Sequence, residues 1–368
     1  MALSKIQGIE GQVTPNLGRR NLFINGAMQV AQRGTSQASI SSAGYYVQDR
    51  FKVNTNDAGV WTQTQESLTT SDTPFQNGFT QALKLDCTTA SASLAAGGTL
   101  QINQAIEGYN LQRLGSGSSS AKSITVSFWI KATKTGTNVL ASYQDDGGKQ
   151  VSATYTINVS NTWEFKTVTL PANTANAVVN DNTRGRLVTW YFAAGSNRTS
   201  GTLRNTWTAY ATADEAVGQV NHADNVANNI HITGIQVEVG DIATDFEHRS
   251  FGEELAACQR YCFVANSSTR TALCIAYFHT TTAVRGGIVT FPITMRVAPT
   301  ITEAGTDSNY NISRPNTSNA GASGVPTTTQ INTNSYELTV TSATASTIGF
   351  GTRILLLSDA AITMDSEL

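Results

Sequence analysis

The sequence predicts an all-β protein made of a jelly-roll-type β-sandwich, a short connecting helix and then a smaller C-terminal β-domain. Three observations predict this fold class. Thr, Ser, Asn and Gly are frequent, and these residues suit pleated strands and tight turns. About ten short segments before residue 240 alternate apolar and polar side chains, which is typical of half-buried strands. Helical periodicity is confined to one stretch near residue 251, so we expect little helix.

Composition and charge exclude several classes of protein. Only 14% of the 368 residues are charged and the net charge is -2, so the chain lacks the basic surface of a nucleic-acid-binding protein. It has no apolar run of the roughly 18 residues that a membrane span needs, and no basic-then-apolar leader. We therefore expect neither membrane insertion nor a signal peptide.

Changes of pattern divide the chain into an N-terminal arm (residues 1–40), a jelly-roll domain (41–245), a connecting helix (246–262) and a C-terminal β-domain (263–368). The arm is polar and shows little core-forming pattern. We expect its basic residues Arg19, Arg20 and Arg33 to contact a partner chain. The alternative is a short apolar strand, ended by Asn25-Gly26, that lies beside the first domain.

The predicted strands of the sandwich are Arg50–Val53, Val60–Thr64, Ala82–Cys87, Leu100–Ile106, Ser123–Lys131, Val139–Tyr143, Val151–Ile157, Trp163–Leu170, Leu187–Ala193, Thr206–Tyr210 and Ile230–Val239. The run Asp145-Asp146-Gly147-Gly148 between two of them is a strong hairpin signal. In the last strand the apolar face shifts at Gly234–Ile235, which predicts a β-bulge.

The connecting helix is predicted from a change of period after residue 249. Phe251, Leu255, Cys258 and Cys262 recur at helical spacing. Ser250 is the expected N-cap, with Glu253 three residues on. A helix this short is unstable alone in water. We therefore predict that these four apolar residues are contacts of a homo-oligomer.

In the C-terminal domain the predicted strands are Ala272–Phe278, Gly287–Phe291, Ile293–Val297, Tyr336–Thr341 and Ile348–Leu357. The segment Asn309–Thr329 is dense in Asn, Ser, Gly and Pro, which predicts a long exposed loop. Within it Tyr310, Arg314 and Asn316 offer an aromatic ring, a charge and an amide to a hydroxylated ligand. The alternatives are a solvated loop and a loop packed on a neighbouring subunit.

Trp129 is the aromatic residue of the sandwich that we expect to bind a sugar. Phe128 shares a face with Ile124, so Trp129 points to the opposite face. An exposed aromatic ring on a rigid sheet suits the C–H face of a sugar. The alternative for Trp129, as for the other aromatic residues of this domain, is a place in the core.

We find no catalytic signature and predict that the protein is not an enzyme and needs no cofactor. The sequence contains no GxSxG, HExxH or P-loop motif. A pair of distant carboxylates for glycoside hydrolysis is the alternative that sequence leaves open. The four cysteines are expected to be small buried thiols, and no metal site is predicted. Asp49, Asp241 and Asp245 are candidates for a structural calcium ion, although solvated loop carboxylates explain them as well.

Four stretches resemble a family of tail fibre and virion proteins of tailed bacteriophages. They are Arg20–Gly34 (RNLFINGAMQVAQRG), Ser123–Lys134 (SITVSFWIKATK), Ile235–Ala257 (IQVEVGDIATDFEHRSFGEELAA) and Cys258–Tyr261 (CQRY). The resemblance spans about residues 20–262, and beyond these only Phe291–Thr300 matches loosely. It implies a middle region similar to a carbohydrate-binding-module jelly roll, and a location in the virion, often in trimeric fibres.

The resemblance and the composition together predict a non-enzymatic tail fibre that attaches a phage to its host. Its expected partners are further copies of itself in a trimer, other virion proteins bound by the arm, and a surface glycan or protein of the host. The first alternative is a capsid decoration or tail adaptor protein with a structural role. The second is a polysaccharide-degrading tailspike.

Overall fold

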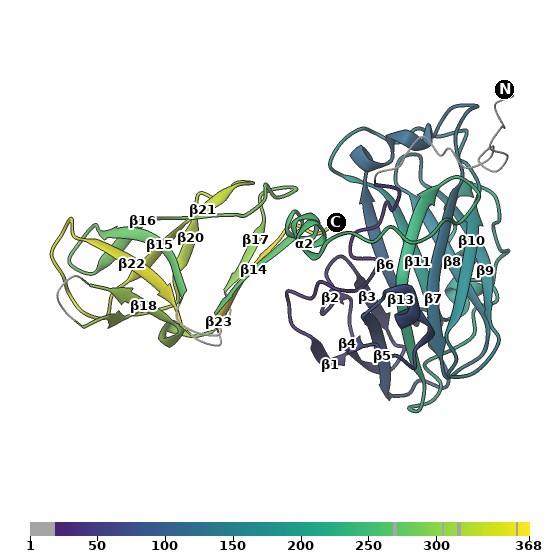
Figure 1. Ribbon diagram of the computed structural model, residues 1–368, viewed down its shortest axis with the longest axis horizontal. Coiled ribbons are helices and arrows are strands. Elements are labelled where there is room, and N and C mark those ends of the chain that lie inside the picture. The colour runs from purple at the N-terminus through teal and green to yellow at the C-terminus, as the bar shows by residue number, and fades with distance from the viewer. Residues whose placement is uncertain (1–18, 268–270, 304, 315–317, 358–359) are drawn as a thin grey trace, which may run out of the picture.

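The computed structural model describes residues 19–267, 271–303, 305–314, 318–357 and 360–368 (Figure 1). From right to left, Figure 1 shows a large β-sandwich, a short helix and a smaller β-lobe. The strand pairs among these residues are antiparallel. The prediction of an all-β fold with a jelly-roll-type sandwich is confirmed.

The sandwich contains two packed sheets. The strands of the first sheet are β1 (Ser36–Ile40), β4 (Val60–Ser67), β5 (Gln81–Thr89), β7 (Ile124–Ala132), β10 (Glu164–Leu170) and β13 (Asn229–Val239). Their order is β1-β4-β5-β13-β7-β10. The strands of the second sheet are β2 (Gly44–Tyr45), β3 (Lys52–Asn56), β6 (Thr99–Glu107), β8 (Gly136–Gln144), β9 (Lys149–Ile157), β11 (Arg184–Ala194) and β12 (Thr208–Ala209). Their order is β12-β9-β8-β11-β6-β3-β2.

Alternation of side chains places the core between these sheets. In β7 the buried residues include Ile124, Val126 and Phe128, whereas Trp129 is only half-buried on the opposite face. Every predicted sandwich strand overlaps an observed one, while β1 and β2 were not predicted. The period-two pattern therefore located this part of the fold correctly.

Two local irregularities follow the sequence closely. The predicted hairpin joins β8 to β9 through Asp145–Gly148. The predicted bulge interrupts the pairing of β13 with β7 between Thr233 and Gln236. Gly234 has φ +63° there, and a Cβ at this position would lie 2.7 Å from the ring of Phe79. Only glycine accommodates both the left-handed backbone and that ring.

The helix α2 (Phe251–Gln259) begins as the sequence predicts. Ser250 is its N-cap and forms a reciprocal capping box with Glu253. The remaining helical segments are short: α1 (Ser196–Thr199) and the 3-10 turns η1 (Thr73–Asn77), η2 (Gly108–Asn110), η3 (Gln112–Leu114), η4 (Thr212–Asp214) and η5 (Asp307–Asn309). None of the helices in the described residues is long and apolar enough to cross a membrane.

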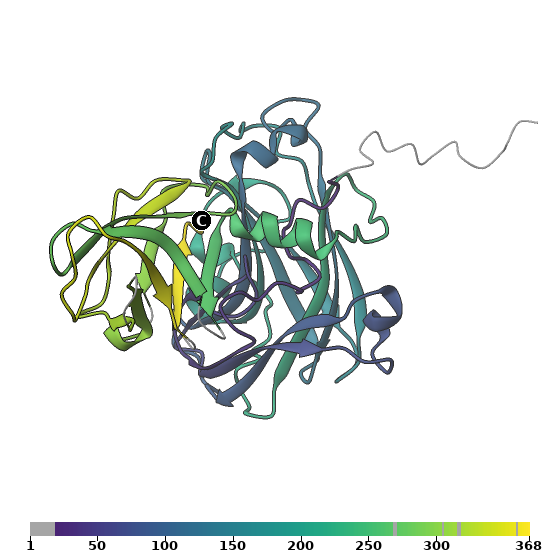
Figure 2. The same cartoon turned by 60° about the vertical axis from the view of Figure 1, so that its left-hand side comes forward.

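The C-terminal lobe has its own core between two sheets. The three-stranded sheet contains β14 (Cys262–Ser267), β17 (Thr300–Glu303) and β23 (Ala360–Asp365), in the order β14-β23-β17. The other sheet contains β15 (Thr271–Phe278), β16 (Ala283–Thr290), β18 (Tyr310–Ser313), β19 (Ala320–Gly321), β20 (Thr327–Thr329), β21 (Ser335–Thr341) and β22 (Gly351–Leu356). Its order is β19-β18-β22-β15-β16-β21-β20. Figures 1 and 2 both show this lobe standing beside the sandwich, with α2 next to the sandwich.

Two predictions for this lobe are wrong. The segment Ile293–Val297 is not a strand, because successive N–H groups bond to separate parts of the chain: Met295 donates to Thr333 O and Arg296 to Arg260 O, both at 2.8 Å. Likewise Asn309–Thr329 is not one long loop. It contributes β18, β19 and β20, which pair with neighbouring strands.

The predicted arm is also wrong for the residues that the structure describes; residues 1–18 lie outside them. Leu22, Phe23 and Met28 belong to the core of the sandwich, and β1 pairs with β4. The side chain of Asn25 donates to Val30 O at 2.8 Å and to Asp49 O at 3.0 Å, which fixes this segment against the sandwich. Leu22, Phe23 and Met28 follow neither strand nor helix spacing, so the sequence pattern did not reveal that this segment is part of the core.

Sandwich and lobe meet at a joint that consists of Arg33, Arg50, Glu107, Arg260 and the segment Asp365–Glu367. Arg260 donates two hydrogen bonds of 2.8 Å to the buried carboxylate of Glu107. Arg50 forms an ion pair with Glu367. Its guanidinium also lies 3.4 Å from the ring centre of Tyr261. Arg33 contacts Asp365 at 3.0 Å. The chain thus returns from the lobe to bind the sandwich, since the Arg33–Asp365 and Arg50–Glu367 contacts join residues more than 300 positions apart.

Candidate functional site

The surface that stands out in the C-terminal lobe is the solvent-facing side of its larger sheet. Ile275 is 77% exposed, Ile288 61% and Tyr277 45%, although all three lie inside regular strands. Their neighbours Cys274, Ala276 and Phe278 on β15 point inward and are buried. We define the outer sheet face by Ile275, Tyr277, Arg285, Ile288, Glu337 and Arg353.

Strand register places these residues next to one another. Ile275 on β15 lies opposite Arg353 on β22, and Tyr277 lies opposite Arg285 on β16. Farther along β16, Ile288 lies opposite Glu337 on β21. Directly opposed side chains in an antiparallel pair have Cβ atoms about 4.5–5.5 Å apart. The face therefore carries two adjoining pairs of an apolar residue and an arginine.

A glycine determines how the Tyr277 ring lies. Gly286 has φ +76°, and a Cβ built there would come within 2.7 Å of an edge carbon of the Tyr277 ring. The absence of that atom lets the ring lean over the β16 backbone. Tyr277 is thus a positioned aromatic surface with one side open to solvent.

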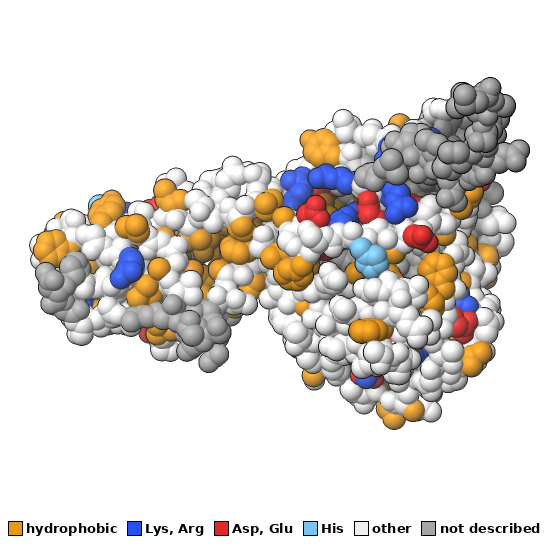
Figure 3. Space-filling model, in the orientation of Figure 1, with side chains coloured by type: hydrophobic (Ala, Val, Ile, Leu, Met, Phe, Trp, Pro, Cys, Tyr) orange, Lys and Arg blue, Asp and Glu red, His pale blue; other side chains and the backbone are white. Residues whose placement is uncertain are grey.

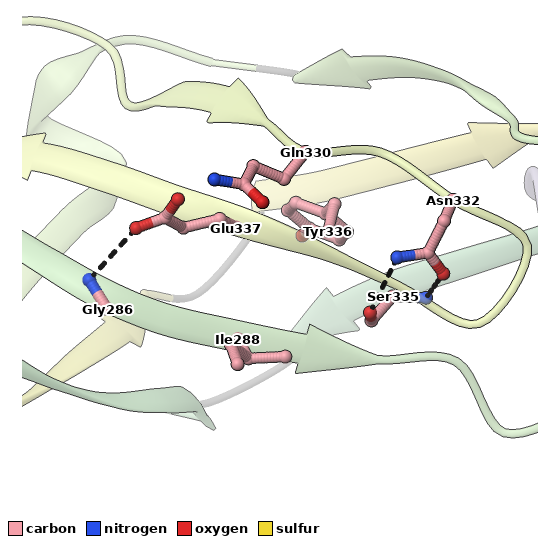
Figure 4. Close-up of a pocket in the computed structure, with 7 residues that line it drawn as sticks. All are labelled: Gly286, Ile288, Gln330, Asn332, Ser335, Tyr336 and Glu337. Atoms are coloured by element: carbon pink, nitrogen blue, oxygen red, sulfur yellow. Dashed lines mark hydrogen bonds between the residues drawn. The ribbon is translucent and has the colours of Figure 1, made fainter.

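A shallow pocket of about 360 Å³ adjoins this ring (Figure 4). It is lined by Gly286, Ile288, Gln330, Asn332, Ser335, Tyr336 and Glu337. Figure 4 shows the Gln330 and Glu337 side chains beside each other over β21. The Glu337 carboxylate accepts from Gly286 N–H at 3.2 Å and from Thr329 Oγ1 at 3.3 Å. The pocket offers amide and hydroxyl groups beside an apolar wall, which suits a hydroxylated ligand.

The arginines of the outer sheet face differ from most others in the chain. Arg285 and Arg353 are exposed, and within the described residues neither forms a hydrogen bond or ion pair. Both guanidinium groups are free to bind an external anion.

Sequence reasoning placed the ligand contacts of this lobe incorrectly. Tyr310 is fully buried in the core of the lobe, because it is the first residue of β18 and faces inward with Ile312. Burial raises the pKa of its hydroxyl, and its ring cannot stack on a ligand. Arg314 donates to Ser318 O at 2.9 Å and to Ala345 O at 3.3 Å, so its guanidinium is already bonded to the backbone of the lobe. Asn316 lies outside the described residues.

The same alternation that buries Tyr310 exposes the residues that sequence reasoning missed. In the predicted strand Ala272–Phe278, Ile275 and Tyr277 share one face while Cys274, Ala276 and Phe278 share the other. The sequence therefore contained this signal, but both faces are apolar and it gives no sign of which is covered.

Trp129 lies on the outer face of the first sandwich sheet, as predicted. It is half-buried, and its ring centre is 5.3 Å from that of Phe165, which is 49% exposed. Nearby, the Trp163 indole N–H donates to Asp72 at 2.8 Å, and Lys131 lies 5.0 Å from the Trp163 ring centre. Sugar binding by Trp129 stays a prediction.

The proposed anchoring arginines Arg20 and Arg33 are occupied within the chain. Arg20 donates to Thr244 Oγ1 at 2.7 Å, and Arg33 is buried among carboxylates of the joint. Both are therefore unavailable to a partner, and this part of the anchoring prediction is wrong. Arg19 is exposed and stays a prediction.

Of the four residues that we predicted as oligomer contacts, only part of the set is exposed. Cys258 and Cys262 are fully buried inside the chain, so predicting them as oligomer contacts was wrong. The buried helix residue beside them is Glu254, whose Oε1 accepts from Asn25 N–H at 2.5 Å. Phe251, the first residue of α2, is 57% exposed, and Leu255 is half-buried.

The candidate calcium ligands do not come together. Asp49 is buried, and its carboxylate is held by the Gln32 side chain and backbone N–H and by Arg33. Burial raises its pKa to about 6. Asp241 and Asp245 are exposed. In the part of the chain that the structure describes, no group of three or more His, Cys, Asp or Glu residues is arranged to hold a metal ion.

No protein-family model matches the sequence, and no curated protein matches it. Among solved structures, the enzymatically active domain of tailspike protein 4 of bacteriophage CBA120 matches at 13% identity and a TM-score of 0.30. The match covers 60% of this chain and 21% of that chain, so this chain spans only a small part of the tailspike structure.

Two carbohydrate-binding modules match over nearly their whole length. TmCBM61 in complex with β-1,4-galactotriose has 12% identity and a TM-score of 0.27, over 60% of this chain and 99% of that one. The family 11 module from Clostridium thermocellum, in complex with a mixed-linked tetrasaccharide, has 9% identity and a TM-score of 0.26, over 57% and 99%. With TM-scores of this size, none of these structures assigns a function to the chain.

Proposed function

We propose that this chain is a non-enzymatic bacteriophage virion protein, a tail fibre that attaches the particle to a glycan on the host surface. The observation that carries the proposal is the outer sheet face. Inside regular strands it exposes an aromatic ring and two isoleucines beside an amide-lined pocket and two arginines that are unpaired among the residues the structure describes. Large exposed apolar residues grouped in this way mark interaction surfaces.

Two further features favour a role in attachment over a catalytic role. The outer sheet face lies on the lobe that stands away from the body of the molecule in Figure 1. Its acidic residue Glu337 accepts two hydrogen bonds from the lobe and has no second acid opposite it across the strands. A carboxylate held in this way serves better to fix β21 beside β16 than to transfer protons. The bacteriophage origin rests on the sequence resemblance of residues 20–262.

Adsorption and labelling test this function together. An antibody against residues 263–368 is expected to label the tails of phage particles and to block their adsorption to host cells. The purified chain is expected to compete with particles for those cells, and the Ile275→Ser/Tyr277→Ser variant to compete poorly. Labelling of the capsid without any effect on adsorption would favour the capsid decoration alternative. Loss of competition in Trp129→Ala instead would move the site to the sandwich.

We also propose that the chain acts as a homo-oligomer, a trimer by the family resemblance. Phe251 is the exposed part of the predicted stripe, with Leu255 half-buried beside it. Native mass spectrometry at micromolar concentration is expected to show the trimer, and Phe251→Asp to shift it toward monomer. A wild-type chain that stays monomeric contradicts the proposal.

A further inference from the structure

We propose that the outer sheet face binds a polysaccharide that carries carboxylates, that is, one built from uronic acids. The inference rests on the proposed attachment function and specifies the class of ligand. Its basis is that an exposed apolar side chain lies opposite an arginine twice across β22, β15 and β16, and that neither arginine has an acceptor within the described ranges.

The first step concerns the charges on the face. Arg285 and Arg353 are exposed and have no acceptor among the described residues. The nearest acid in the register is Glu337, opposite Ile288, and its carboxylate is already held by Gly286 N–H and Thr329. The two cations are thus not neutralised by the sheet itself, and an anionic ligand complements them.

The second step concerns the shape of the anion. A guanidinium presents a planar fork of N–H groups that matches a carboxylate with two parallel hydrogen bonds. Tyr277 and Arg285 lie directly opposite each other, with Cβ atoms about 4.5–5.5 Å apart. A single sugar ring can therefore place its apolar face on Tyr277 and its own carboxylate on Arg285. A phosphate in the linkage between sugars lies outside the ring and fits this spacing less well.

The third step concerns repetition. Ile275 and Arg353 repeat the apolar–arginine pair two residues earlier along β15 and on its other side. Two such sites side by side suit a polymer with a recurring acid better than one small anion. Gly286 keeps the Tyr277 ring leaning over β16, so the two sites are separated by fixed strands. The amide-lined pocket beyond Ile288 is then available for the hydroxyls of a further sugar.

Binding of the full chain to three immobilised polymers tests the proposal: polygalacturonate, a poly(glycerol phosphate) teichoic acid, and neutral dextran. We expect binding to polygalacturonate that weakens as NaCl rises from 50 to 500 mM. Each charge-assisted arginine contact contributes about 1.5–3 kcal/mol, so Arg285→Ala/Arg353→Ala is expected to lose about 100-fold or more in affinity. Tyr277→Ser is expected to lose about tenfold.

Arg314→Ala is the matched control, because it removes an arginine of the same lobe that already bonds to Ser318 and Ala345. It is expected to bind polygalacturonate as the wild type does. An equal loss in Arg314→Ala, or binding to the teichoic acid alone, overturns the proposal. Binding to dextran alone would also refute it, yet would leave glycan attachment intact, whereas failure of attachment itself appears in the adsorption assay with living cells.

Discussion

At the joint, Arg33, Arg50 and Arg260 are held by carboxylates from distant parts of the chain, whereas Arg285 and Arg353 on the outer sheet face have no partner among the described residues. Figure 3 shows surface charges of both signs gathered on the sandwich near α2, whereas most of the visible C-terminal lobe is white or orange. The same residue type thus fixes the fold in one region and is left free in the other. Burial and pairing, rather than residue identity, separate the arginines that hold the fold from those left exposed.

The largest loss in the free energy of unfolding is expected for substitutions at the joint. Arg50→Met removes the closest cation from the buried carboxylate of Glu367 and leaves Arg33, at 3.6 Å, as its ion-pair partner, so the cost approaches the roughly 3–5 kcal/mol of a broken buried pair only in part. We expect urea unfolding to show this loss. The Arg50→Met/Glu367→Gln double variant is expected to recover part of it, because neither charge then remains unpaired. If Arg50→Met unfolds at the same urea concentration as the wild type, the joint does not hold the two regions together.

The second prediction concerns pH, because the stability of the sandwich and that of the lobe are expected to depend on pH in different ways. His222 is buried in the sandwich and bonded to Asn138, and burial lowers the pKa of its imidazole to about 3. In the folded protein the imidazole therefore binds a proton less readily than in the unfolded chain, where its pKa is the ordinary 6.5. The sandwich consequently keeps this contribution to its stability in full above pH 6.5 and loses it as pH falls toward 3. The five tryptophans all lie in the sandwich, so their fluorescence reports its unfolding alone. In His222→Gln the free energy of unfolding of the sandwich is expected to fall less between pH 6.5 and 3, by a few kcal/mol, than in the wild type.

The lobe is expected to respond in the opposite direction. Burial raises the pKa of Glu303 on β17 to about 7. Its contribution to stability is therefore full below pH 4.5 and is lost as pH rises through 7. Hydrogen exchange of β17 and β23 measured from pH 4.5 to 8 checks this, after correction for the intrinsic exchange rate. Glu303→Gln should make protection there independent of pH over this range; an unchanged pH dependence would show that another group is responsible.

An intermediate effect is expected within the sandwich. Gly234→Ala places a methyl group 2.7 Å from the Phe79 ring at a backbone φ of +63°. Strain of this kind costs about 1–3 kcal/mol. Gly349→Ala is the control, since its φ of +84° is near that of Gly234 and no atom lies within 4 Å of a Cβ built there. A larger loss of melting temperature in Gly234→Ala than in Gly349→Ala supports a bulge packed on Phe79; equal losses assign the cost to the backbone alone.

The smallest effect is expected on the outer sheet face. Arg285→Ala and Arg353→Ala remove exposed side chains that have no partner in the described part of the chain, so each should change the free energy of unfolding by no more than about 0.5 kcal/mol. Chemical denaturation followed by circular dichroism measures this. A loss near that of Arg50→Met would mean that these arginines support the fold and would end the contrast between the two regions.

Much of the fold was predictable because it depends on neighbours in sequence. Alternation located the sandwich strands, Gly234 marked the bulge, and Ser250 with Glu253 marked the start of α2. These signals act over a few residues, where backbone sterics and hydrogen bonding decide the conformation.

The rest depends on partners far away in the sequence. Glu254 faces inward because Asn25, 229 residues earlier, donates to it, and this contact overrides the apolar stripe of α2. Tyr310 faces inward because β18 pairs with β22. For the candidate site, the predicted ligand residue Tyr310 proved to be buried, because the composition of a loop does not reveal a strand whose partner lies about forty residues away.

Cys262 on β14 pairs with Asp365 on β23, and this pairing bears on whether the lobe can be replaced by another domain. The C-terminal lobe leaves the joint on β14 and returns to it on the neighbouring strand β23, so its two ends lie side by side. A segment with adjoining ends can be replaced without moving the rest of the chain. A different lobe grafted between Cys262 and Asp365 would leave Arg33, Arg50 and their acidic partners in place. It would need to replace the contacts that Arg296 makes with Asn182, Arg260, Ser366 and Glu367.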